Sequence, residues 1–159
     1  MNFRDLRRSM IVLVNTVNVI ESSRETALAK TAMQKAMMWT GTYMKFSGLG
    51  ENPYEKNDGT RKTVADIQPM FDFTLETLHA DLLSEGQISV VDSMRTYLGE
   101  QIDAFMAYGT NTELIQEMES TLEPENLVHT NMCMFNIYTA LTEARMWLGT
   151  ELGRIRDAA

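Results

Sequence analysis

Basic and aromatic side chains that could bind an anionic ligand occur mainly in the first part of the chain. Arginine and lysine donate hydrogen bonds to phosphate, and bases stack on aromatic rings or guanidinium planes. Arg24 also lies beside the predicted start of a helix, where backbone N–H groups attract anions. The candidate ligand-binding residues are Phe3, Arg7, Arg8, Arg24, Tyr54, Arg61 and Lys62. For each of them, ordinary solvated surface charge or helix packing is the alternative interpretation.

The net charge of −8 is unevenly distributed. Residues 1–45, the basic front, hold seven Lys/Arg and three Asp/Glu, a net charge of +4. Residues 64–159 hold four arginines and sixteen acidic residues, a net charge of −12. Such a chain repels DNA and RNA polymers, whereas its basic front could hold a small anion. We therefore expect ligand binding to depend on Arg7 and Arg24, and charge reversal at Arg154 or Arg156 to have little effect.

Residues that could perform catalysis or bind a metal form no pattern in the sequence. His79 and His129 are isolated from other metal ligands, and there is no phosphate-binding or dinucleotide-binding motif. The single cysteine, Cys133, excludes an internal disulfide framework and fits a reducing cytoplasm. No apolar run is long enough to span a membrane, and the N-terminal segment is interpreted as an amphipathic helix and not a signal peptide. We predict a protein that is not an enzyme, with no catalytic residue, metal or cofactor.

The spacing of apolar residues predicts an all-α protein. Apolar residues three and four apart predict a helix over residues 3–20. Ser22 and Glu25 form a candidate capping box that would begin a second helix, ending at Phe46. The short connection makes these two helices an antiparallel hairpin. Further helices are predicted from Pro69 to Gly86, over residues 88–108 and 114–118, and from Pro124 to about Arg156.

We divide the chain into three parts. Residues 1–46 are a first helical-hairpin repeat, residues 47–86 a long polar loop with a connecting helix, and residues 87–159 a second helical-hairpin repeat. The last helix carries a nearly heptad-spaced apolar stripe that includes Leu141 and Leu148, which favours contact with another subunit. The thirteen methionines fit an adaptable core or methionine-lined interfaces.

An internal repeat supports this division. Residues 31–42 and 139–150 are identical at seven of twelve positions without a gap, and the identities include Trp39 with Trp147. Repeats of this kind bury their apolar faces on one another. We predict two diverged copies of an antiparallel hairpin that form a covalent pseudo-dimer, with both tryptophans in the core and not stacked on bases.

The segment from Ser23 to Trp39 resembles the signature helix of the phage anti-CBASS cyclic-oligonucleotide sponges. In that family the helix reads roughly Ser-Arg-Glu, then Leu-Ala-x-Thr-x-Leu-x-x-Ala-x-Met-Trp. The second copy is similar in its latter half, from Glu143 to Gly149, but lacks the Ser-Arg-Glu entry. The resemblance covers residues 3–60 and, more loosely, residues 88–156, and it leaves open whether one or both copies bind.

The resemblance implies a function. Members of this family are small helical proteins that assemble into oligomers, often hexamers. They bind cyclic dinucleotides or trinucleotides between subunits without cleaving them, and so deprive a host defence effector of its signal. We therefore expect a cyclic oligonucleotide ligand, no polymeric nucleic acid or membrane partner, a homo-oligomer (trimer or hexamer) and a location in the cytoplasm of the infected host cell. The alternative is a helical protein-binding inhibitor or assembly protein with no nucleotide ligand.

Overall fold

The computed structural model describes residues 2–47 and 86–158, which form five helices and no strand. The helices are α1 (Phe3–Val17), α2 (Arg24–Phe46), α4 (Gln87–Gly109), α5 (Thr112–Thr121) and α6 (Pro124–Ala158). The predicted all-α class is confirmed for these residues. The loop and helix expected between residues 48 and 85, and with them Tyr54, Arg61 and Lys62, lie outside the described residues.

Local sequence explains where the helices begin. Ser23 is the N-cap of α2: its side chain accepts a hydrogen bond from the backbone N–H of Thr26, whose side chain accepts one from the N–H of Ser23. This reciprocal box lies one residue later than the predicted box of Ser22 and Glu25. Pro124 begins α6, as expected for a residue whose φ suits the first helical turn and which has no N–H to leave unpaired.

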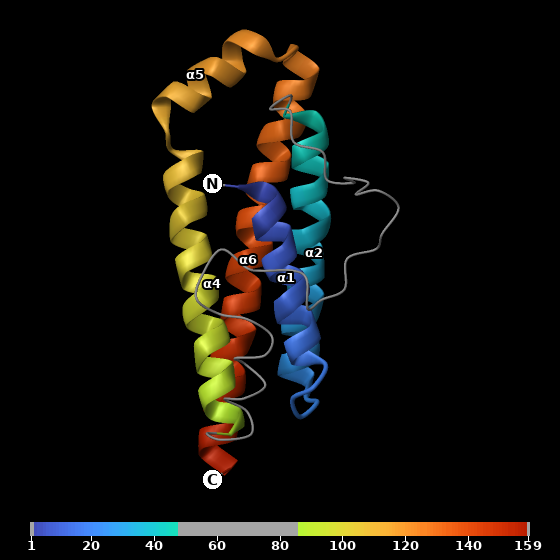
Figure 1. The fold of residues 1–159 in the computed structure, drawn as a ribbon, viewed down its shortest axis with the longest axis vertical. Coiled ribbons are helices and arrows are strands. Elements are labelled where there is room, and N and C mark those ends of the chain that lie inside the picture. The colour runs from blue at the N-terminus through green and yellow to red at the C-terminus, as the bar shows by residue number, and fades with distance from the viewer. Residues whose placement is uncertain (1, 48–85, 159) are drawn as a thin grey trace.

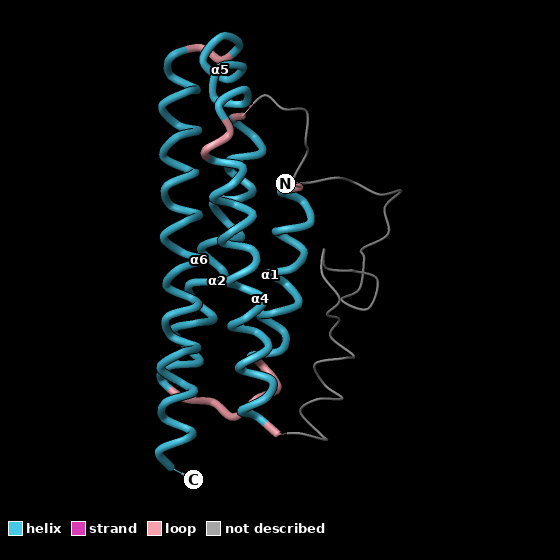
Figure 2. The backbone as a smooth tube through the Cα atoms, turned by 90° about the vertical axis from the view of Figure 1, so that its left-hand side faces the viewer, coloured by secondary structure: helices cyan, strands magenta, loops and turns pink. Residues whose placement is uncertain are grey.

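Four long helices run side by side and α5 lies across one end of the bundle (Figures 1 and 2). The helices α2 and α6, the central pair in the sense that they share the most extensive contact, run in opposite directions, while α1 packs on α2 and α4 packs on α6. Because α5 has few contacts with α6, it acts mainly as the connection between α4 and α6. None of the described helices is both long and apolar enough to cross a membrane.

The buried faces of α2 and α6 correspond position by position. Seven buried residues of α2 each have a buried counterpart 108 residues later in α6. Those of α2 are Ala29, Ala32, Met33, Ala36, Thr40, Tyr43 and Met44, and those of α6 are Ile137, Ala140, Leu141, Ala144, Leu148, Glu151 and Leu152. Trp39 and Trp147 are both half-buried against this core, and Met38 and Met146 are both exposed.

One buried charge joins the two central helices. Glu151 of α6 has no exposed surface, and its carboxylate accepts a hydrogen bond of 2.6 Å from the hydroxyl of Ser23, the N-cap of α2. Arg154, one turn along α6, forms an ion pair with the same carboxylate and lies 3.9 Å from a carboxylate oxygen of Glu25. The start of α2 is thus fixed to the last third of α6 by polar contacts.

The apolar stripe predicted for subunit contact on α6 instead faces the interior. Leu141 and Leu148 are fully buried within the chain, because α2 and α4 both pack on this helix and cover its apolar side. Tyr138, which belongs to the same predicted stripe, is exposed. So are four large apolar side chains of α6 outside the stripe, Val128, Met132, Phe135 and Met146.

Candidate functional site

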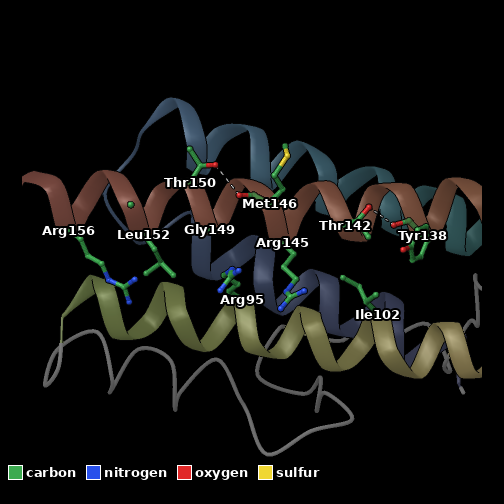
Figure 3. Close-up of a pocket in the computed structure, with 11 residues that line it drawn as sticks. Arg95, Ile102, Tyr138, Thr142, Arg145, Met146, Gly149, Thr150, Leu152 and Arg156 are labelled. Atoms are coloured by element: carbon green, nitrogen blue, oxygen red, sulfur yellow. Dashed lines mark hydrogen bonds between the residues drawn. The ribbon is translucent and has the colours of Figure 1, made fainter.

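A groove of about 700 Å³ lies between α4 and α6 (Figure 3). It is open to solvent along one side of the bundle. Two elements far apart in sequence form it, because α4 packs on α6. Its lining residues are Arg95 and Ile102 of α4 and Tyr138, Thr142, Arg145, Met146, Gly149, Thr150, Leu152, Gly153 and Arg156 of α6.

Three arginines give this groove its charge. The guanidinium groups of Arg95, Arg145 and Arg156 lie in the space between the two helices in Figure 3. No described residue forms a hydrogen bond or an ion pair with any of them, and the described residues that line the groove include no carboxylate. The Nε atom of Arg95 is shielded from solvent and has no hydrogen-bond partner.

Glycines make room for two of these arginines. A Cβ atom added to Gly149 of α6 would lie 3.1 Å from Nε of Arg95, and one added to Gly99 of α4 would lie 3.4 Å from Nε of Arg145. Each guanidinium therefore rests on the bare backbone of the opposite helix. Gly153, one turn beyond Gly149, has no atom near its position for a Cβ.

The remaining lining residues are uncharged. The hydroxyls of Thr142 and Thr150 donate hydrogen bonds to the backbone carbonyls of Tyr138 and Met146 in their own helix, so only their lone pairs remain available to a ligand. The side chains of Tyr138 and Met146 are partly exposed. The groove thus combines guanidinium donors for an anion with apolar and aromatic surface. In the described ranges, no three His, Cys, Asp or Glu side chains are grouped as a metal site would need.

The residues predicted from the basic front lie elsewhere. Phe3 is buried, 2% exposed, and its ring packs against Tyr43 and Tyr108 with centroids 4.3 and 4.8 Å away. Its ring therefore offers no free face for base stacking. Arg8 lies 3.6 Å from a carboxylate oxygen of Asp5, in a half-exposed ion pair.

The structure does not gather these predicted arginines into one cluster. Arg7 is half-buried in the first half of α1, with its Nε atom shielded from solvent. Arg24 begins α2, at the opposite end of this helix pair, and its guanidinium lies 5.6 Å from the ring centre of Trp147. Arg24 thus makes a cation–π contact with a tryptophan of α6.

The groove was missed because its arginines belong to the acidic part of the sequence. Three of the four arginines after residue 63 line it, yet Arg95 and Arg145 lie in different helices and meet only through the packing of α4 on α6. One signal in the sequence could have indicated it. Both helices contain arginine four residues before glycine, which puts a long cation and a gap on the same helical face.

Comparison with known proteins adds no relative to this description. No protein-family model matches the chain, and neither does any curated protein or solved structure. The site is therefore assigned from the geometry of the groove between α4 and α6.

Proposed function

We propose that the protein binds a cyclic oligonucleotide in the groove between α4 and α6 and sequesters it without reacting with it. The observation that carries this proposal is the set of three arginines, Arg95, Arg145 and Arg156, that line one groove with no carboxylate among its described lining residues. Unpaired guanidinium groups suit phosphate oxygens, to which they donate two parallel hydrogen bonds. The resemblance of Ser23 to Trp39 to the sponge family supplies the ligand class.

The acidic charge of the surrounding chain limits which anions can bind. A nucleic acid polymer would contact a wide surface of a chain whose net charge is −8, and would be repelled. A small ring contacts only the groove, whose described lining residues carry guanidinium groups and no carboxylate. Short-range contacts dominate there because charges beyond about 8–10 Å are screened at physiological salt. The proposal therefore replaces our expectation that binding depends on the basic front.

Sequestration fits the groove better than catalysis does. Phosphodiester cleavage needs an activated nucleophile or a metal-bound water. The described lining residues include no histidine, cysteine or carboxylate, and the two threonine hydroxyls donate to backbone carbonyls. A ligand held by these side chains would leave unchanged.

We also propose that the α1/α2 and α4/α6 pairs are diverged copies of one hairpin that meet as a pseudo-dimer. The support is the matching of buried positions in α2 and α6 at a constant shift of 108 residues, together with the sequence identity of residues 31–42 and 139–150. Because one chain holds two units, a trimer would contain as many units as a hexamer of single-hairpin chains.

A second candidate function rests on a different observation. Val128 and Phe135 of α6 are 66% and 68% exposed, and large exposed apolar side chains on one helix can bind another protein. In this case the protein would be an inhibitor or assembly factor without a nucleotide ligand. Binding of a cyclic oligonucleotide by the purified protein alone distinguishes the two functions.

The test is calorimetric titration of the purified protein with a panel of cyclic dinucleotides and trinucleotides. We expect at least one to bind, and Arg145→Glu to weaken it by about 1–3 kcal/mol, the scale of a charge-assisted hydrogen bond. Arg24→Glu and Arg8→Glu are the matched controls on the basic front. If these controls lose binding while Arg145→Glu does not, the ligand binds at the basic front. If no ring in the panel binds, the sequestration function is wrong.

A separate measurement tests the absence of chemistry. Ligand incubated with the protein and released by heat denaturation should be recovered intact, because the groove provides no group that attacks phosphorus. Chromatography of the released ligand checks this, with protein-free ligand heated in parallel. Recovery of linear or hydrolysed nucleotide would assign the protein to enzymes.

A further inference from the structure

The two helices that form the groove carry the same short motif. In α4 it reads Arg95-Thr-Tyr-Leu-Gly99, and in α6 it reads Arg145-Met-Trp-Leu-Gly149. Leu98 and Leu148 are both fully buried, so each motif is anchored to the core at the same position. Each arginine lies beside the glycine of the other motif, where a Cβ atom would stand 3.1 Å (Gly149) or 3.4 Å (Gly99) from its Nε atom. The pairing is therefore reciprocal.

We propose that Arg95 and Arg145 form a clamp for a single phosphate group, and that Gly99 and Gly149 are the positioning residues that set where the two guanidinium groups stand. The identity of the ligand as a phosphate compound rests on the proposed function, whereas the clamp itself rests on the geometry of the two motifs.

The spacing of the guanidinium groups suits one phosphate between them. Arg95 lies at Gly149 and Arg145 at Gly99, and in each helix arginine and glycine are four residues apart. Four residues rise about 6 Å along a helix, so the two groups are offset by about one turn along the groove. Two forked donors at that offset can reach different oxygens of the same tetrahedral anion.

The glycines matter because each leaves the space that a guanidinium occupies. A methyl group at Gly149 would come within 3.1 Å of Nε of Arg95, closer than most real Cβ contacts, so the arginine would have to shift by a few tenths of an ångström. At Gly99 the distance is 3.4 Å, so Arg145 would shift less. Moving the end of a flexible side chain costs little folding free energy, but it spoils the alignment that two-sided binding needs.

The first hairpin has no such clamp. Met37 stands 108 residues before Arg145, at the corresponding position of α2, and is partly buried. The first hairpin therefore has a thioether in place of the Arg145 guanidinium group. We expect one phosphate clamp per chain, so calorimetry should give one site per chain and not two.

Three alanine substitutions test the clamp, with inorganic pyrophosphate as the anion probe and calorimetry at fixed ionic strength. We expect Gly149→Ala to weaken pyrophosphate binding about tenfold and Gly99→Ala a few-fold, in the order of their distances from the arginines. Ser120→Ala, at an exposed position of α5 that does not line the groove, should bind within about twofold of the parent protein. Thermal melting should show Gly149→Ala and Gly99→Ala at least as stable as the parent, because alanine is favoured over glycine inside a helix.

The outcomes separate the clamp from the proposed function. If the parent binds no cyclic oligonucleotide but binds pyrophosphate in the Gly149-dependent way, the clamp holds and the sponge function is wrong. If a cyclic oligonucleotide binds equally to parent and Gly149→Ala, the clamp is wrong and the ligand lies elsewhere. Absence of pyrophosphate binding by the parent, or equal binding of citrate and pyrophosphate, also overturns it. If Gly149→Ala unexpectedly unfolds, Arg145→Lys decides: it keeps the charge but loses the fork, so unchanged pyrophosphate affinity contradicts the clamp.

Discussion

Glu151 is the residue on which the polar contact between α2 and α6 depends. It lies in the apolar contact of two helices, yet its carboxylate is fully engaged by the hydroxyl of Ser23 and the guanidinium of Arg154. Burial raises the pKa of Glu151, but the hydrogen bonds from Arg154 and Ser23 and the positive charge of Arg154 outweigh burial and hold its pKa below the ordinary value. The carboxylate is thus ionised in the folded protein at neutral pH.

Substitution of Glu151 should therefore have a pH-dependent cost. Because the folded-state pKa is lowered, the ionised carboxylate contributes stability above its ordinary pKa, and this contribution is lost as the pH falls through the folded value. We expect Glu151→Gln to reduce the free energy of unfolding at pH 7 by roughly 1–3 kcal/mol, and the difference from the parent to shrink below about pH 4. Urea unfolding at several pH values measures it.

Glu117→Gln on α5 is the matched control, since Glu117 is exposed and its side chain has no ion pair with a described residue. Its effect should be near zero at every pH. A constant stability difference between Glu151→Gln and the parent, from pH 7 to acid, would mean that the charge of Glu151 contributes nothing to folding.

At the scale of helices, small side chains allow α2 and α6 to lie close together. Ala36 and Ala144 are fully buried at equivalent positions of the two helices. Replacing either alanine by leucine should destabilise the protein by about 1–3 kcal/mol, because added methylenes in a packed core displace its neighbours. Met38→Leu and Met146→Leu, at exposed positions of the same helices, should change stability little. Thermal or urea unfolding measures the stability of the four variants. Equal stability of the alanine and methionine variants would contradict close packing at Ala36 and Ala144.

The helices were predictable from sequence and the groove was not, for a physical reason. Apolar spacing and caps act within a few residues, so the helix that ends near Phe46 and the one that begins at Pro124 were located to within a residue or two. The N-cap of α2 was predicted at Ser22 but is Ser23. The hydroxyl of Ser23 also donates a hydrogen bond to Glu151, 128 residues away, which no local pattern reveals. Arg95 and Arg145 likewise meet through a contact between helices that no local pattern encodes. Phe3 was misjudged similarly, because its aromatic partners Tyr43 and Tyr108 are distant in sequence.

At the scale of the whole molecule, we expect a homo-oligomer formed through the exposed apolar side chains of α6. Phe135 is the most exposed of them, at 68%. Phe135→Asp should therefore convert the assembly to smaller species without changing helix content, as measured by light scattering and circular dichroism. Val19→Asp is the matched control: Val19 is also exposed, at 48%, but lies between α1 and α2. If the parent protein is monomeric at micromolar concentration, the exposed apolar side chains of α6 do not form a contact between subunits.

The central position of the contact between α2 and α6 has a consequence for how the chain folds. Contacts within a hairpin join residues close in sequence, whereas the bond between Ser23 and Glu151 closes a loop of 128 residues. Each doubling of loop length adds about 0.6 kcal/mol of closure entropy, and non-local contacts slow folding. The hairpins should therefore form early and dock late. Before docking, the large apolar faces of α2 and α6 are open to hairpins of other newly made chains, so exchange of hairpins between chains is the characteristic misfolding risk of this architecture.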